Sequence, residues 1–190
     1  MPILRLAIVS SVLLPLSTPV LAQSAGDSAA PTIPESQLEP VPAFSPYAFL
    51  TSAASSNDFE VKAAELALQK AEDAEVKAFA QMMLDDHTKA QQELIAAGEA
   101  DKVEIGKPGV DGDQDRMLGR LELPSGAEFD RIYIETQAAA HIRAIALFQG
   151  YQDGETNLHA FAQKTLPTLS GHYAMAVKLA ERLKVPLQAQ

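Results

Sequence analysis

Between residues 45 and 183, apolar side chains recur at three- and four-residue spacing, the pattern of helices with one buried face. The first such segment begins at Ser45-Pro46, a capping hydroxyl followed by proline, and extends to about Ala71. A second segment follows Asp73, which can cap it, and ends at Gly98. The turn between them is only a few residues long, so we expect the two helices to run antiparallel.

The same periodicity returns in the second half of the chain. A third predicted helix opens at Ser125 and Glu128, which have the spacing of a capping box, and closes at Gly150 and Gly154. A fourth extends from about Asn157 to Leu183. The short connection between these helices predicts a second antiparallel hairpin.

The connection between the two hairpins, Gly98 to Pro124, is about 27 residues and too long for a turn. Gln114 to Leu123 predicts a short helix within it, capped by the acidic run Asp111 to Asp115 and packing on the bundle end. The residues expected to make that contact are Met117, Leu118 and Leu121. Two hairpins with one long crossover indicate an all-α, ferritin-like antiparallel four-helix bundle. An up-down bundle with a loose loop is the alternative.

The first 22 residues have the pattern of a secretory signal peptide. Arg5 is the only charge, Leu6 to Leu16 is a short apolar run, and small residues end at Ala22, where we expect cleavage. We therefore expect a periplasmic or secreted protein. The apolar run is shorter than the roughly 18 residues that span a bilayer, and no later segment reaches that length, so we expect no transmembrane segment in the mature chain. A retained membrane anchor is the alternative.

Residues 23–45 are rich in Pro, Ala and Ser and predict an extended tether, which leaves residues 46–185 as the bundle domain.

Lys and Arg number 15 against 25 Asp and Glu, a net charge of −10, so we expect no nucleic-acid partner. The absence of cysteine excludes disulfides, thiolate metal sites and thiol catalysis. The sequence indicates neither a protein partner nor an oligomeric state.

Three of the four histidines lie on the apolar faces of three different predicted helices: His87, His141 and His172. Counted from the hairpin turns at 1.5 Å per residue, these side chains and Glu60 lie roughly 16 to 22 Å along the bundle. We therefore expect one carboxylate and three imidazoles to meet near its middle.

A weak internal repeat agrees with two equivalent hairpins. Val76 to Gln81 in the second predicted helix resembles Leu158 to Gln163 in the fourth. Aligned on this repeat, Glu60 corresponds to His141, and the other two histidines correspond to each other. In this alignment His172 lies about one helical turn further along its helix than His87 does. We attribute this offset to Pro167, which should kink the fourth helix.

A buried carboxylate and three imidazoles predict a site for a transition-metal ion such as zinc, iron, copper, manganese or nickel. The expected ligands are Glu60, His87, His141 and His172, because a bound cation satisfies buried polar groups and keeps the carboxylate ionised. The alternative is that the histidines hydrogen-bond one another, Tyr133, Tyr173, Glu60 or water as core residues without metal.

Three stretches carry a resemblance to a known family: Phe79 to His87, Ser125 to Asp130 and Thr165 to Leu169. They resemble the bacterial exported family called domain of unknown function 4142, over about Phe49 to Leu183. The resemblance implies a ferritin-like four-helix fold, often labelled a predicted outer membrane protein, without a demonstrated activity. The family commonly has an acidic residue before the third-helix histidine, whereas this chain has Ala140, which leaves His141 without that carboxylate partner.

Catalysis has little support in the sequence. Di-iron proteins of ferritin-like fold need Glu-x-x-His on two helices, but Leu84, Ala138 and Leu169 stand three residues before the histidines. The sequence leaves enzymatic activity open but favours its absence, and it indicates no catalytic residues; an enzyme with a mononuclear metal centre is a distant third hypothesis. The first hypothesis is an exported module that binds a transition metal, and the alternative is a non-catalytic structural or interaction module of the cell envelope without metal.

Overall fold

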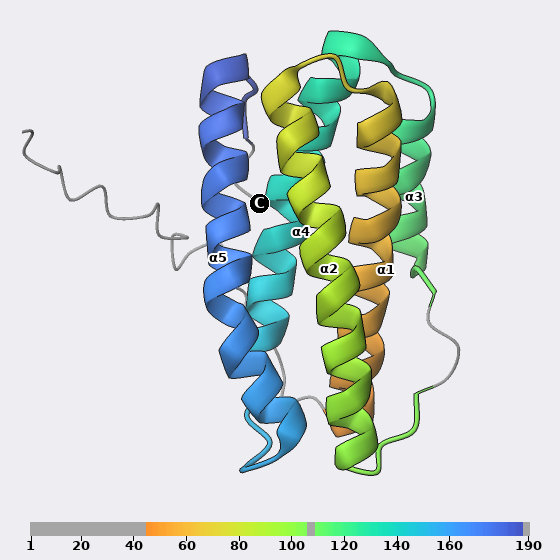
Figure 1. Cartoon of the computed structure of the whole chain (residues 1–190), viewed down its shortest axis with the longest axis vertical. Coiled ribbons are helices and arrows are strands. Elements are labelled where there is room, and N and C mark those ends of the chain that lie inside the picture. Colours follow the sequence, from red (N-terminus) through yellow and green to blue (C-terminus); the bar gives the residue numbers. More distant parts are fainter. Residues whose placement is uncertain (1–44, 106–108, 188–190) are drawn as a thin grey trace, which may run out of the picture.

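The structure is a computed structural model that describes residues 45–105 and 109–187, which form five α-helices (Figure 1). In chain order the helices are α1 (Pro46–Lys70), α2 (Ala74–Ala100), α3 (Gly112–Glu122), α4 (Gly126–Gly150) and α5 (Asn157–Leu183). The predicted signal peptide (1–22) and the tether (23–45) lie outside the described residues, apart from Ser45.

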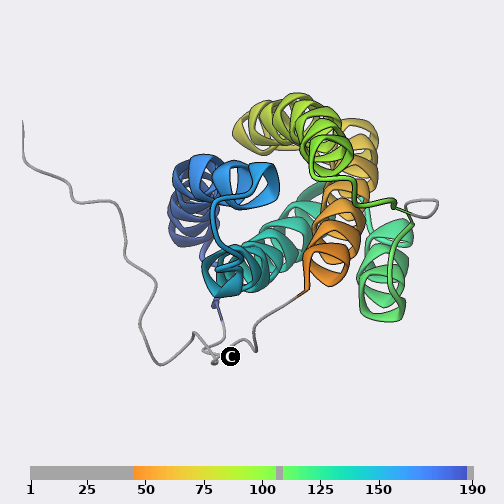
Figure 2. The same cartoon turned by 90° about the horizontal axis from the view of Figure 1, so that it is seen from below.

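The four long helices pack as two antiparallel hairpins, α1 with α2 and α4 with α5, around a shared apolar core. Figure 2, along the bundle axis, shows these helices around a common centre with α3 outside them, beside α1 and α4. A crossover that contains α3 joins the hairpins. The predicted ferritin-like antiparallel four-helix bundle is therefore confirmed.

The starts of the first two helices follow the predicted capping signals. The side chain of Ser45 accepts a hydrogen bond from the Ala48 N–H, and Pro46 occupies the first turn of α1. The side chain of Asp73 caps α2. The predicted end of α2 at Gly98 is wrong, because the helix continues to Ala100. A Cβ at Gly98 would lie 2.7 Å from Leu50 Cδ2, so this glycine permits close helix packing.

The predicted capping box at the start of α4 is also wrong. Ser125 is the N-cap residue but makes no side-chain capping hydrogen bond. Gly126 follows it at φ +63°, a left-handed conformation that brings the chain into the helix along a different path. A capping box instead occurs at α3, where Asp111 and Gln114 bond reciprocally, as expected of an acidic run that caps this helix.

The short crossover helix forms as predicted but packs elsewhere. Leu118 and Leu121 are buried, and α3 contacts the flank formed by α1 and α4 instead of covering the bundle end (Figures 1 and 2). The crossover segment is long enough to return along the bundle, and α1 and α4 offer two helices against which an apolar face can be buried.

Carboxylates that reach across from the other hairpin close the helix ends. Asp130 of α4 accepts hydrogen bonds from the N–H groups of Glu72 and Asp73, in the α1–α2 turn. Asp101, which follows α2, accepts from the N–H groups of Asn157 and Leu158 at the start of α5. Backbone donors at helix N-termini lack partners within the helix, so these contacts both satisfy them and tie the hairpins together.

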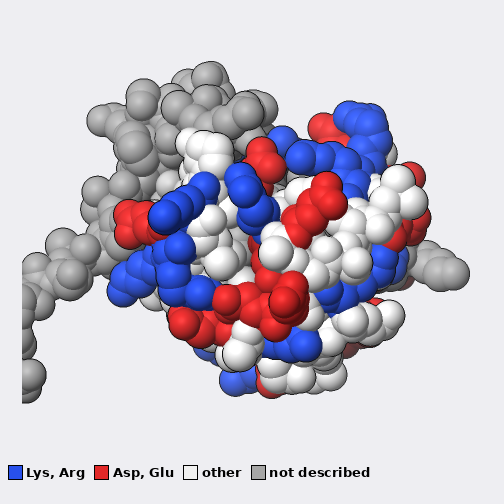
Figure 3. All heavy atoms as spheres, turned by 90° about the horizontal axis from the view of Figure 1, so that it is seen from above, with Lys and Arg blue, Asp and Glu red and all other residues white. Residues whose placement is uncertain are grey.

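The surface is mixed in charge at the end that carries the α1–α2 turn. Figure 3 shows acidic and basic side chains intermingled there, without a continuous basic face. Among the described residues, no helix combines the length and the apolar character that crossing a bilayer requires.

Candidate metal centre

Four polar side chains from four helices lie in the middle of the apolar core. Glu60 comes from α1, His87 from α2, His141 from α4 and His172 from α5, and each residue is at most 3 % exposed. The three imidazole ring centroids are 5.4 to 5.7 Å apart. The helices therefore bring the three histidines to one level of the bundle.

The ring of His87 is oriented by a hydrogen bond from α1. Its Nδ1 lies 2.9 Å from Oδ1 of Asn57, and the amide nitrogen of Asn57 in turn donates to Gln91 Oε1 at 3.2 Å. Because Asn57 Oδ1 is only an acceptor, Nδ1 of His87 carries the proton and Nε2 is left with a lone pair.

The ring of His141 is held by its own helix. Its Nδ1 lies 2.9 Å from the backbone carbonyl oxygen of Gln137, one turn earlier, so this nitrogen carries the proton. Ala140 provides no carboxylate, and the Gln137 carbonyl occupies the position of an outer hydrogen-bond partner instead. The lone pair of His141 is on Nε2.

The ring of His172 is turned the other way from those of His87 and His141, with Nε2 on the outer side. Its Nε2 lies 3.0 Å from Oδ2 of Asp86, on α2, so Nε2 carries the proton and Nδ1 keeps the lone pair. The side chain of Asp86 is 44 % exposed, while that of His172 is 3 % exposed. This carboxylate connects the buried ring to the solvent.

The three unprotonated nitrogens face one another. His87, His141 and His172 can each offer one nitrogen, all within 4.8 Å of one another. Nε2 of His141 is 3.4 Å from Nδ1 of His172, and Nε2 of His87 has no hydrogen-bond partner. With the outer nitrogens protonated, no hydrogen is left to lie between the inner ones. Three lone pairs directed at one small volume form a ready ligand set for a cation.

Burial keeps these rings neutral. Desolvation lowers the pKa of His87 well below its usual value, and the nearby rings of His141 and His172 lower it further. The pKa of His141 falls to about 3, mainly through burial, and that of His172 is also lowered by burial, against the effect of Asp86. Neutral imidazole is the form that binds metal ions.

Glu60 lies beside the three nitrogens but outside the group that they form. Its Oε2 accepts a hydrogen bond from Gln137 Nε2 at 2.7 Å, and its Oε1 lies 3.7 Å from His141 Nδ1, the protonated nitrogen. Burial raises the pKa of Glu60 to about 8, against the lowering effect of Gln137. Burial and the proximity of Glu60 raise the pKa of Tyr133.

Three residues important for the site were not found from the sequence: Asn57, Asp86 and Gln137. A signal existed for Asn57, a polar residue one turn from Glu60 on the apolar side of its helix. Gln137 is four residues before His141 and shares its face. Asp86 had no such signal, because its place beside His172 depends on how α2 packs on α5.

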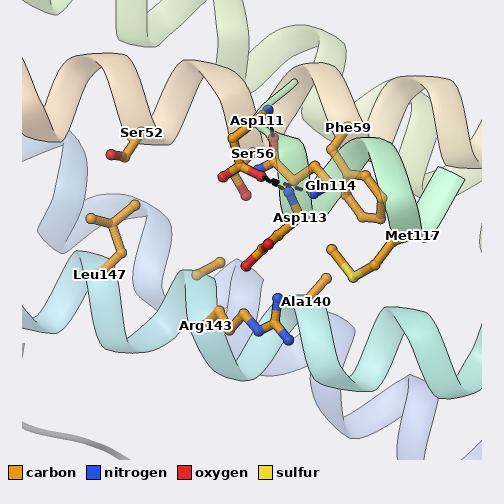
Figure 4. Close-up of a pocket in the computed structure, with 11 residues that line it drawn as sticks. Ser52, Ser56, Phe59, Asp111, Asp113, Gln114, Met117, Ala140, Arg143 and Leu147 are labelled. Atoms are coloured by element: carbon orange, nitrogen blue, oxygen red, sulfur yellow. Dashed lines mark hydrogen bonds between the residues drawn. The ribbon is translucent and has the colours of Figure 1, made fainter. Parts of the chain in front are cut away.

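A separate pocket of about 190 Å³ lies between α1, α3 and α4 (Figure 4). Its lining includes Ser56, Asp113, Gln114 and Arg143, and none of the three histidines or Glu60. Ala140 faces this pocket, whereas the next residue, His141, is in the core. The pocket and the histidine cluster are therefore distinct features.

Comparisons with known proteins identify a family and one solved structure of similar fold. A family model described as a domain of unknown function (DUF4142) matches residues 31–179, which confirms the resemblance inferred from the sequence. A crystal structure described as a "putative secreted protein DUF305" from Streptomyces coelicolor is similar, with a TM-score of 0.63 and 10 % identity. The similarity covers 75 % of this chain and 94 % of that chain. No curated protein matches the sequence.

Proposed function

We propose that this chain, which belongs to the DUF4142 family, binds one transition-metal ion inside its helical bundle. The ligands are Nε2 of His87, Nε2 of His141 and Nδ1 of His172. Glu60 lies beside them, and a bound cation would favour its ionised form, whose charge would offset that of the ion.

The observation that carries this proposal is the arrangement of the hydrogen bonds around the three rings. Each outer nitrogen faces an acceptor, and the inner nitrogens of His141 and His172 approach to 3.4 Å with no hydrogen to share. Two lone pairs in that position repel each other unless a cation lies between them. Metal-bound histidines in proteins usually have such outer partners.

Imidazole ligands suit zinc, copper, iron and nickel better than manganese, which prefers oxygen. A set of three neutral nitrogens leaves the ion its positive charge, and two carboxylates are close enough to compensate it: Glu60 near His141 and Asp86 on His172. We infer that the protein acts outside the cytoplasm, since the N-terminal sequence predicts a signal peptide and the structural neighbour is described as a "putative secreted protein".

The test is Zn²⁺ binding to the metal-free mature chain, measured by calorimetry together with elemental analysis of natively purified protein. We expect about one equivalent per chain and an increase in melting temperature on binding. Alanine at His87, His141 or His172 should weaken binding at least about a hundredfold, since removal of one ligand costs more than removal of an outer partner.

His159→Ala is the matched control, because this partly exposed histidine bonds only to Gly154 and Gln163 at the surface. It should leave the affinity unchanged. Circular dichroism checks that each variant is folded. Substoichiometric metal in the wild type, with equal melting with and without Zn²⁺, would contradict the proposal and favour a structural module without metal.

A further inference from the structure

The three histidines differ in how firmly their outer partners hold them. The partner of His87 is Asn57, which is 5 % exposed and itself hydrogen-bonded to Gln91. The partner of His141 is a backbone carbonyl within α4. The partner of His172 is the carboxylate of Asp86, which is 44 % exposed. Only the third ligand is therefore connected directly to the solvent.

The helix segment that carries this third ligand is also the weakest of the three. Pro167 lies inside α5 and has no N–H group, so the carbonyl oxygen of Gln163 receives no helical hydrogen bond from it. Gly171 directly precedes His172, and glycine lowers helix stability through its greater backbone freedom. Local opening requires least free energy where backbone hydrogen bonds are missing and glycine is present.

The other two ligands lie on uninterrupted helix. Between Ala74 and Ala97, α2 contains neither proline nor glycine, and α4 contains none between Ala127 and Gln149. His87 and His141 are therefore a fixed pair, on helices without a hinge. The pocket of Figure 4 does not account for this difference between the helices, since its lining includes none of the three histidines.

We propose that the metal ion enters and leaves between α2 and α5, by local opening of the α5 segment Pro167–Gly171, which carries His172 away from the fixed pair. Asp86, on α2, remains at the opening and attracts the cation from solvent. This inference rests on the proposed function and extends it: the site exchanges its ion and acts as a carrier or buffer, in contrast to a permanent structural metal.

Two substitutions test the opening without touching a ligand. In Gly171→Ala the added Cβ meets no atom within 4 Å, so the helix is stabilised without a clash. Pro167→Ala restores a donor for the Gln163 carbonyl. Both should make opening rarer, and because free and loaded protein must open in the same way, association and dissociation rates should fall together while the Kd stays constant.

The measurement is stopped-flow Zn²⁺ uptake by the mature chain and Zn²⁺ release to an excess of a chromophoric chelator. We expect both rates to fall roughly two- to fivefold in Gly171→Ala and about tenfold or more in Pro167→Ala. Gly119→Ala in α3 is the matched control: its Cβ also meets open space, and its exchange rates should equal those of the wild type.

The outcomes separate the two proposals. If the wild type binds Zn²⁺ through the histidines but both variants exchange it at wild-type rates, the opening of α5 is excluded and the proposed function stands. If only dissociation slows, the Kd changes, and the substitutions act on the bound state, which also contradicts the opening. If the wild type binds no Zn²⁺, both proposals fail.

Discussion

The ends of this bundle and its middle differ in whether their polar groups have hydrogen-bond partners. At the ends, the carboxylates of Asp130 and Asp101 each meet two backbone N–H groups, so donors and acceptors balance. In the middle this balance fails: Nε2 of His87 and the hydroxyl of Tyr133 have no partner, and the inner nitrogens of His141 and His172 face each other with no hydrogen between them. Balanced groups stabilise a fold, whereas unpaired polar groups in the core are costly unless a ligand satisfies them. The difference is what we expect if the ends serve the fold and the middle serves the proposed metal binding.

The strongest test of this difference is a substitution at one end. Asp130→Ala leaves the N–H groups of Glu72 and Asp73 without their acceptor, and we expect a loss of about 3 kcal/mol in the free energy of unfolding. Urea denaturation measures it. Zn²⁺ affinity should not change, because Asp130 is at the end of the bundle, whereas the histidines are in its middle.

Asp85→Ala is the control for this experiment. Asp85 is an exposed carboxylate that accepts a hydrogen bond only from Gln81, and its loss should cost at most about 0.5 kcal/mol. A similar loss of stability in both variants would remove the contrast between a buried cap and a surface carboxylate.

The pH dependence of stability tests the middle of the metal-free protein. Folded Glu60 keeps its proton up to about pH 8, while in the unfolded chain a glutamate releases it near pH 4.5, so stability falls as pH rises between these values. The histidines have lowered pKa values in the fold, so they reduce stability as pH falls below about 6.5. Below this pH the effect of the three histidine protons outweighs that of the single Glu60 proton. The free energy of unfolding should therefore be largest near pH 6.5, about the usual pKa of histidine.

The contribution of Glu60 to stability should decrease by about 1.6 kcal/mol from pH 6.5 to pH 8, and the difference between the wild type and Glu60→Gln isolates it, because the histidines contribute equally to both. Denaturant unfolding at several pH values measures the decrease. In Glu60→Gln it should be absent, because no proton remains to be released. An unchanged decrease in that variant would mean that another group causes it.

The smallest expected effect concerns an outer hydrogen bond. Asn57→Ala removes the acceptor that fixes the His87 ring, and we expect Zn²⁺ affinity to fall about tenfold, which is about 1.4 kcal/mol. Gln91→Ala, which removes the partner of Asn57 but leaves the bond to His87, should have a smaller effect. Equal effects would show that Asn57 acts through general packing.

Periodicity and hairpin length were sufficient to predict the bundle and the level at which the histidines meet, because a helix converts residue number directly into distance. They could not predict ring orientation. His172 presents Nδ1 while the other two rings present Nε2, and this depends on which acceptor each outer nitrogen meets. The position of Glu60 beside His141 Nδ1, at 3.7 Å, likewise depends on side-chain packing that residue counting does not contain.

Capping residues in the sequence predicted the helix starts correctly only where the next residue has a right-handed helical conformation. Ser45 and Asp73 cap their helices as predicted, whereas Ser125 does not, since Gly126 turns the chain into a left-handed conformation. Gly98 shows the same limit, because the close approach of Leu50 explains the glycine better than a helix end does.

The exchange of carboxylate caps between hairpins has a consequence for how the chain folds. Asp130 of α4 accepts hydrogen bonds from the α1–α2 turn, and Asp101, after α2, accepts them from the start of α5. Neither hairpin therefore has all its backbone N–H groups satisfied on its own. Separated halves would each expose uncompensated amides along with their apolar faces. The chain should therefore fold as one cooperative unit, and an amide proton at residue 72 or 158 should exchange with solvent only when both halves come apart.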